Sequence, residues 1–279
     1  MQETWRWFGP KDTVSLEQIR QAGATGIVTA LDHIPTGEIW PKQDINERKQ
    51  LINQSGLEWS VVESVPIHQD IKLRNGNYQG LITNYCQTLI NLGELGVTRV
   101  CYNFMPVVDW TRTNLNFEIN NTSSALRFEM ADFVAYDIHI LKRHNASSDY
   151  DEIQLANAEE RFLQMTASDK AELESNIIAG LPGGEGSYTR ESITRAIEDF
   201  RGIGTEGLRA NLIAFLQDIL PTAESAGLVL AIHPDDPPFS LFGLPRVVST
   251  AEDARTIINT IPSPSNGLTM CAGSFGARS

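Results

Sequence analysis

The chain is predicted to fold as an α/β protein around a parallel sheet, because short apolar runs alternate with amphipathic helical patterns along most of its length. The apolar runs are unbroken, which is typical of strands that are buried on both faces. The clearest run is Leu228–Ile232, which leads into His233 and then into Pro234. Because proline cannot donate to a sheet ladder, we expect this strand to end at His233.

Composition argues against several classes of partner. The 279 residues are 41% hydrophobic, which is enough for a sizeable core, and the formal net charge is −13. This acidic balance argues against nucleic acid and against an anionic membrane surface as partners. No apolar run approaches the ~20 residues of a membrane span, and the amino terminus lacks a signal pattern. The three cysteines form no Cys-x-x-Cys pair, which indicates a reducing compartment, so we expect a cytoplasmic protein.

Strands and helices alternate in the predicted order. The first helix begins at Ser15, with Gln18 as the capping-box partner, and Gly23 ends it. The predicted strands are Thr4–Phe8, Gly26–Leu31, Leu57–Val65, Val97–Phe104, Leu228–Ile232 and Gly267–Ala272. The helices that follow the first one are Asp44–Ser55, Leu81–Leu92, Gly207–Ala226 and Ala251–Ile261.

The alternation stops after the fourth strand. Helix-like patterns fill this interval, and a connection of this length is unusual unless it forms a lid or cap over a site. We therefore expect a single domain over residues 1–279 with an inserted helical cap at about 107–205. The patterns lie around Ala125–Leu141, Asp151–Met165, Asp169–Ala179 and Arg190–Arg201.

The number of strands limits the choice of fold. A (β/α)₈ barrel has eight strands, and the sequence provides about six of them. No Gly-x-Gly-x-x-Gly motif lies at a strand-to-helix turn and no P-loop is present, which argues against a dinucleotide or a nucleoside triphosphate. The prediction is therefore an incomplete parallel barrel that lacks its last strands.

Polar and metal-ligating side chains follow the predicted strands, at the rim where parallel barrels carry their active sites. Each has a structural alternative, such as a surface ion pair for Arg6 or a buried apolar role for Cys271. A Ser-His-Asp hydrolase fits less well, because no Gly-x-Ser-x-Gly elbow is present. The strand-end residues are Arg6, His33, Glu63, Asn103, His233, Asp235 and Cys271.

Within this set, His233 and Cys271 are the best candidates for a pair of metal ligands. Imidazole and thiolate groups on adjacent strands offer two ligands to a divalent transition metal. Two ligands are too few for tight binding, so the others must come from Glu63, from Asp235 or from the missing strands.

Long motifs occur in one order from end to end of the chain, at Thr4–Pro10, Gly23–Gly26, His33–Pro35, Trp59–His68, Cys101–Pro106, His233–Pro238, Gly243–Arg246 and Thr269–Cys271. Together they resemble the motifs of the mannonate dehydratase family of bacterial hexuronate catabolism. The resemblance implies a TIM barrel, a (β/α)₈ fold of the xylose-isomerase-like type, with a helical cap. It also implies a hydro-lyase that removes water from D-mannonate to give 2-dehydro-3-deoxy-D-gluconate in glucuronate breakdown.

The resemblance further implies a divalent metal, for which we expect Mn²⁺ with Fe²⁺ as the alternative. In the family pattern, His233 and Cys271 match two metal ligands. Arg6, His33 and Asn103 are expected to bind the substrate, and Asp235 is expected to support His233.

The family's remaining ligands and its acid–base residues have no counterpart before Ser279, so we expect a chain that is truncated at its carboxyl end. Two alternatives stay open. They are another metal-dependent sugar isomerase or epimerase on the same type of barrel, and an inactive truncated chain. The expected partner is a small sugar acid, and a homo-oligomer is possible.

Overall fold

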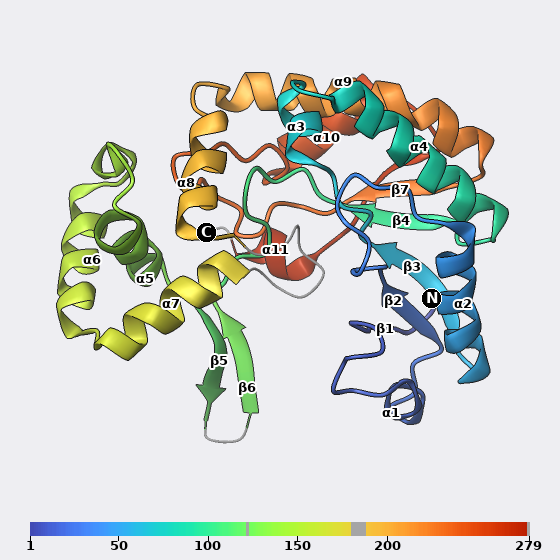
Figure 1. The fold of residues 1–279 in the computed structure, drawn as a ribbon, viewed down its shortest axis with the longest axis horizontal. Helices are drawn as coiled ribbons and strands as arrows, with labels where there is room; N and C mark the ends of the chain where they lie inside the picture. Colours follow the sequence, from blue (N-terminus) through green and yellow to red (C-terminus); the bar gives the residue numbers. More distant parts are fainter. Residues whose placement is uncertain (121–122, 180–187, 278–279) are drawn as a thin grey trace. The chain divides into compact units, whose positions relative to one another are not determined.

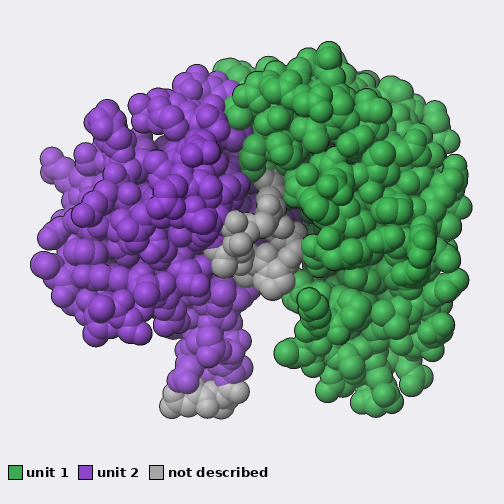
Figure 2. Space-filling view, viewed as in Figure 1, with its two compact units in different colours: residues 1–104, 205–234, 247–279 green, residues 105–204, 235–246 purple. Residues whose placement is uncertain are grey.

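The structure, a computed structural model, describes residues 1–120, 123–179 and 188–277, which form two compact units (Figures 1 and 2). Unit 1 comprises Met1–Phe104, Thr205–Pro234 and Val247–Ser279, and unit 2 comprises Met105–Gly204 and Asp235–Arg246. The second unit therefore interrupts the chain of the first twice.

Unit 1 contains a parallel sheet with the strand order β1-β2-β3-β4-β7-β8 (Figure 1). All the strands predicted from the sequence are present in the described residues, although each is shorter than its apolar run. The α/β fold and the six parallel strands are therefore confirmed. The strands are β1 Thr4–Arg6, β2 Gly26–Thr29, β3 Glu58–Glu63, β4 Arg99–Tyr102, β7 Val229–Ile232 and β8 Asn266–Leu268.

Two helices of unit 1, α1 and α10, begin at a capping box. Ser15 accepts from the backbone N–H of Gln18 and completes the predicted capping box, and Thr250 does the same with Asp253. A short helix after β3 was not predicted, and the His68 side chain caps it. The helices are α1 Leu16–Gln21, α2 Lys42–Gln54, α3 Gln69–Leu73, α4 Tyr78–Glu94, α9 Gly204–Ser225, α10 Ala251–Thr260 and α11 Ala272–Gly276.

One face of the sheet is covered by α4 and α9. Phe215 of α9 contacts the rings of Tyr85 on α4, Tyr102 on β4 and Phe104, with ring centroids 5.3, 6.2 and 5.7 Å away. All four side chains are buried. This aromatic cluster joins two helices to the centre of the sheet. None of the described helices, α9 included, has an apolar stretch long enough to cross a membrane.

Unit 2 differs from the purely helical cap that the sequence predicts. The predicted helix from Ala125 begins only at Met130, because Ser123–Arg127 pairs antiparallel with Asn114–Ile119. Asn120 leaves the first of these strands with a left-handed φ of 52°, which asparagine tolerates. The elements are β5 Asn114–Ile119, β6 Ser123–Arg127, α5 Met130–Ala135, the π-helical turn Tyr136–Leu141, the 3₁₀ turn Ala146–Asp149, α6 Glu152–Gln164, α7 Ala167–Ala179 and α8 Arg190–Asp199.

Phe215→Ala is expected to lower the free energy of unfolding by about 3–5 kcal/mol, because it leaves a cavity between three aromatic rings. Urea denaturation followed by circular dichroism measures the change. Gln217→Ala alters an exposed position on the same helix and is the matched control. Equal stability of the two variants would contradict the role given to the aromatic cluster.

Candidate active site

Side chains from strands that are not neighbours meet on one face of the sheet. Arg6 Nε on β1 lies 3.5 Å from Glu63 Oε2 on β3, although β2 runs between them. Cys101 Sγ on β4 lies 3.2 Å from the Oγ1 of Thr269, which follows β8, although β7 runs between them. In a flat sheet such strands are about 10 Å apart, which is too far for Cys and Thr side chains to meet. The sheet therefore curves toward these four residues, and we call them the inner cluster.

Alternation along the strands decides which residues share this inner face. Glu63 is directly opposite Cys101 in the ladder, and Cys101 is opposite Ala231. Because side chains alternate with a period of two, the intervening Tyr102 points to the outer face, where it contacts Phe215. Asn103 lies two residues beyond Cys101, and His233 lies two residues beyond Ala231. The same alternation predicts that both side chains lie on the inner side.

The Cys101 thiol acts as a hydrogen-bond donor in the inner cluster. Its Sγ is 3.6 Å from Glu63 Oε1, and the side chain is buried. Burial raises the pKa of this thiol well above its usual value, and the negative charge of Glu63 raises it further. Because the thiolate is the reactive form, the raised pKa disfavours a nucleophilic role for Cys101 at neutral pH.

His233 takes the tautomer that a metal-binding imidazole needs. It follows β7 directly, is buried, and its backbone N–H donates to Tyr102 O at 2.6 Å. Its ring Nδ1 is 2.7 Å from the carbonyl oxygen of Pro234. A carbonyl oxygen can only accept, so Nδ1 carries the hydrogen and the lone pair of the neutral ring lies on Nε2. A backbone carbonyl that orients a histidine in this way is a common partner of metal ligands.

Cys271 lies three residues beyond β8, at the start of α11. Its sulfur accepts hydrogen bonds from Ser274 Oγ at 3.2 Å and from Ser274 N at 3.5 Å. These contacts hold the sulfur at the start of α11. Imidazole and thiolate groups such as those of His233 and Cys271 are both suitable ligands for a divalent transition metal. Within residues 1–120, 123–179 and 188–277, no group of three or more His, Cys, Asp or Glu side chains is arranged to hold a metal ion.

The three residues predicted to bind substrate are not all brought together. Arg6 belongs to the inner cluster, and Asn103 is buried directly after β4. His33, in contrast, lies in an open hollow beside α2, where its Nε2 is 2.9 Å from Asp44 Oδ2 and its side chain is 57% exposed. Sequence position alone could not reveal that His33 pairs with a helix that follows its strand.

Asp235 is the first residue of the second segment of unit 2, and it is fully buried there. Burial lowers the pKa of the Arg246 guanidinium, and the negative charge of Asp235 is the largest effect that opposes this shift. The next residue, Asp236, accepts two hydrogen bonds from Arg112 at 2.8 and 2.9 Å. Charged partners within unit 2 thus hold the beginning of this segment.

Two members of the inner cluster, Cys101 and Thr269, were missed as site residues. Cys101 stands two residues before Asn103 on the same strand, so period-two alternation was the signal that could have found it. Thr269 directly precedes the Met270-Cys271 pair of the last motif. Its contact with Cys101 depends on the curvature of the sheet, which the sequence does not show.

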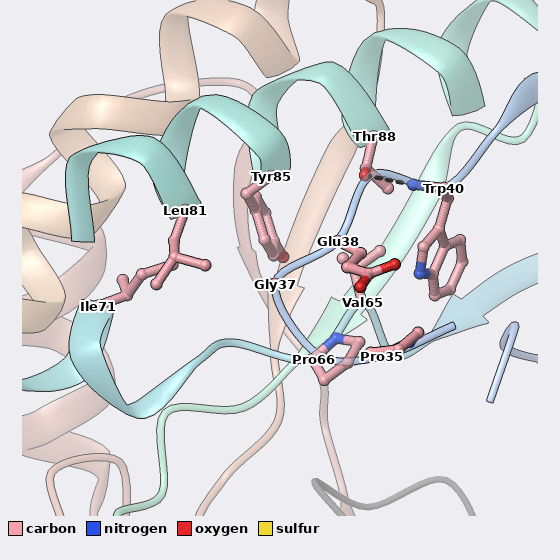
Figure 3. Close-up of a pocket in the computed structure, with 10 residues that line it drawn as sticks. All are labelled: Pro35, Gly37, Glu38, Trp40, Val65, Pro66, Ile71, Leu81, Tyr85 and Thr88. Carbon is pink, nitrogen blue, oxygen red and sulfur yellow. Dashed lines mark hydrogen bonds between the residues drawn. The ribbon is translucent and has the colours of Figure 1, made fainter. Parts of the chain in front are cut away.

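The cavity beneath α4 is a different feature (Figure 3). Trp40, Val65, Leu81 and Tyr85 are among its lining residues, and Trp40 N donates to Thr88 Oγ1 at 3.0 Å. Its volume of about 10 Å³ holds no more than one water molecule. A sugar acid does not fit there.

Comparison with known proteins shows which family the chain belongs to. The sequence profile of the D-mannonate dehydratase (UxuA) family matches residues 1–279. The chain belongs to this family. The mannonate dehydratase of Saccharophagus degradans is 62% identical over 278 residues, which cover 100% of this chain and 70% of that protein. Mannonate dehydratase 2 of Agrobacterium fabrum is 56% identical over 279 residues, with the same two coverages.

A solved structure extends the comparison to the fold. The crystal structure of mannonate dehydratase from Streptococcus suis serotype 2 matches with a TM-score of 0.75 and 37% sequence identity. The match covers 99% of this chain and 65% of that one, so the chain spans just under two thirds of the solved protein. Family membership, and with it the predicted resemblance, is confirmed over the whole chain.

The thiols are expected to differ in reactivity. At pH 8, a disulfide reagent should modify the half-buried Cys271 before Cys101, because Cys101 is buried and its pKa is raised. Mass spectrometry of peptides from the native protein after timed labelling measures the order. Labelling of Cys101 at the same rate as Cys271 would show that the inner cluster is open or that Cys101 is ionised.

Proposed function

We propose that the protein dehydrates D-mannonate to 2-dehydro-3-deoxy-D-gluconate, as a step of hexuronate and glucuronate catabolism. The observation that carries this proposal is the tautomer of His233. In a chain of this family, the contact of Nδ1 with Pro234 O leaves the lone pair of the neutral ring on Nε2, as a metal ligand requires. The inner cluster adds a cation and polar groups that suit a small anionic polyol.

The reaction removes a weakly acidic proton beside a carboxylate, so negative charge develops on the carboxylate oxygens. A bound divalent metal supplies a Lewis acid that stabilises such charge. His233 through Nε2 and Cys271 through Sγ would hold this ion. We propose Mn²⁺, with Fe²⁺ as the alternative, since nitrogen and sulfur ligands also suit a softer ion than manganese.

Arg6 and Asn103 are proposed to bind and orient the substrate. The guanidinium of Arg6 can pair with the substrate carboxylate, and the amide of Asn103 can donate to or accept from a hydroxyl group. A binding role for His33 stays a prediction, since its ring pairs with Asp44. For Asp235 we propose a supporting role, in which its buried charge keeps the segment that follows His233 in place.

The organisation of the chain is part of the proposal. We propose one barrel domain over residues 1–279 that contains the segment around 107–205 as an inserted cap. We also propose a cytoplasmic location and leave assembly into a homo-oligomer as a prediction.

Product formation tests the function directly. The protein should be incubated with D-mannonate and Mn²⁺, and NMR should detect the 2-keto-3-deoxy acid. We expect product, loss of activity after chelation and recovery when Mn²⁺ is restored. Absence of product in the presence of Mn²⁺ would sink the proposal. Turnover of neutral sugars with D-mannonate left unchanged would favour the isomerase alternative.

His233→Ala is expected to weaken Mn²⁺ binding by at least about 10–100-fold. Removing a residue that only hydrogen-bonds to a metal ligand already causes a loss of this size, so removing the ligand itself should cost no less. Electron paramagnetic resonance of free Mn²⁺ during a titration measures the affinity. His144→Ala, at an exposed position in unit 2, is the matched control. Wild-type affinity in His233→Ala would remove this histidine from the metal site.

A further inference from the structure

We propose that Glu63 recognises hydroxyl groups of the substrate, as the acceptor that stands beside the cation Arg6. This inference rests on the proposed function, because it takes a sugar acid as the ligand of the inner face. Glu63 is not one of the two proposed metal ligands, and the inference gives its carboxylate a role in substrate binding.

The position of Glu63 leaves acceptor capacity unused. It is the last residue of β3, it shares the inner face with Cys101, and its side chain is 24% exposed. In the described residues its polar partners are Arg6 Nε, 3.5 Å from Oε2, and the Cys101 thiol, 3.6 Å from Oε1. The Arg6 contact is longer than a normal N–H···O hydrogen bond, and a carboxylate has about four acceptor positions. A ligand that brings hydrogen-bond donors can therefore still bind there.

The neighbours of Glu63 keep it in the role of an acceptor. Burial keeps the Cys101 thiol protonated, so the thiol can only donate to the carboxylate. Arg6 also carries donors alone. Thr269 Oγ1 is 3.2 Å from both Ala231 O and Cys101 Sγ. Within the inner cluster, Glu63 carries the only carboxylate.

The charge pattern selects the ligand. A guanidinium beside a carboxylate matches a molecule with one carboxylate and a chain of neutral hydroxyl groups, which is the chemistry of a sugar acid. Hydrogen bonds from hydroxyl groups to an ionised carboxylate are roughly twice as strong as those between neutral groups. A second acidic group, as in a dicarboxylate or a sugar phosphate, would instead meet the negative charge of Glu63. Glu63 would therefore determine specificity for monocarboxylates.

A purely structural role is the competing explanation, in which Glu63 acts only by holding Arg6. The two explanations differ in what the carboxylate touches. If Glu63 accepts a hydrogen bond from one substrate hydroxyl group, the affinity falls when either the carboxylate or that hydroxyl group is removed. Removing both together then weakens binding no further, because the same hydrogen bond is lost. If it acts through Arg6, removing a hydroxyl group does not change the effect of the substitution.

The test is a binding cycle between Glu63 and the substrate hydroxyl groups. Calorimetry on the protein with Mn²⁺ should measure the affinity of wild type and of Glu63→Gln for D-mannonate and for its series of monodeoxy analogues. We expect Glu63→Gln to bind D-mannonate about tenfold more weakly, in line with the loss of a charge-assisted hydrogen bond. For one analogue, which lacks the hydroxyl group that donates to Glu63, the same substitution should have no effect.

Matched variants exclude loss of folding as the cause. Glu58→Gln makes the same change at the exposed amino end of β3 and should bind like wild type. Thermal melting checks that Glu63→Gln is folded. If it is not, Glu63→Asp keeps the charge, withdraws the carboxylate by one methylene group and should show the same dependence on one hydroxyl group.

The remaining outcomes of the calorimetry contradict either the inference about Glu63 or the proposed function. Equal affinity of wild type and Glu63→Gln, or an equal loss for D-mannonate and every analogue, overturns the inference and leaves the proposed function intact. A wild-type protein that does not bind D-mannonate overturns the proposed function, and the inference with it.

Discussion

The curvature of the parallel sheet is the constraint on which the candidate site depends. It brings Arg6 to Glu63 and Cys101 to Thr269 across intervening strands. The period-two alternation of the strands then separates two environments. Cys101 points to the inner face and the adjacent Tyr102 points to the outer one, where Phe215 fixes it against the helices. A shift of one residue in the register of β4 would exchange a polar donor for an aromatic ring in the site.

Much of the fold could be predicted because the relevant signals are local. Unbroken apolar runs predicted the strands, and the cap at Ser15 predicted where the first helix begins. The end of β7 at Ile232 was predicted correctly, whereas the ends of the other strands were predicted too far along the chain. Apolar residues such as Phe104 are also buried in the loops, so burial alone does not mark the end of a ladder. The antiparallel pair of β5 and β6 was missed, since two paired strands are only marginally stable by themselves and the sequence does not show the pairing.

The candidate site was predictable only in part, for a related reason. A histidine or cysteine after a buried strand can be found from the sequence, as His233 and Cys271 were. The partner that a side chain chooses depends on distances that the sequence does not contain. His33 pairs with Asp44 on α2, and the carbonyl of Pro234 determines the tautomer of His233. Glu63 was one of several possible metal ligands at first, and its contacts with Arg6 and Cys101 now indicate a different role.

The central claim is that the inner face of the sheet binds a sugar acid beside a metal held by His233 and Cys271. A crystal structure of the protein with Mn²⁺ and D-mannonate, collected with anomalous data for manganese, tests it most directly. We predict manganese at His233 Nε2 and Cys271 Sγ, the substrate carboxylate near Arg6 and a substrate hydroxyl group at Glu63. Substrate in the hollow lined by His33, Asp44 and Arg48, or manganese bound away from His233, would contradict the claim.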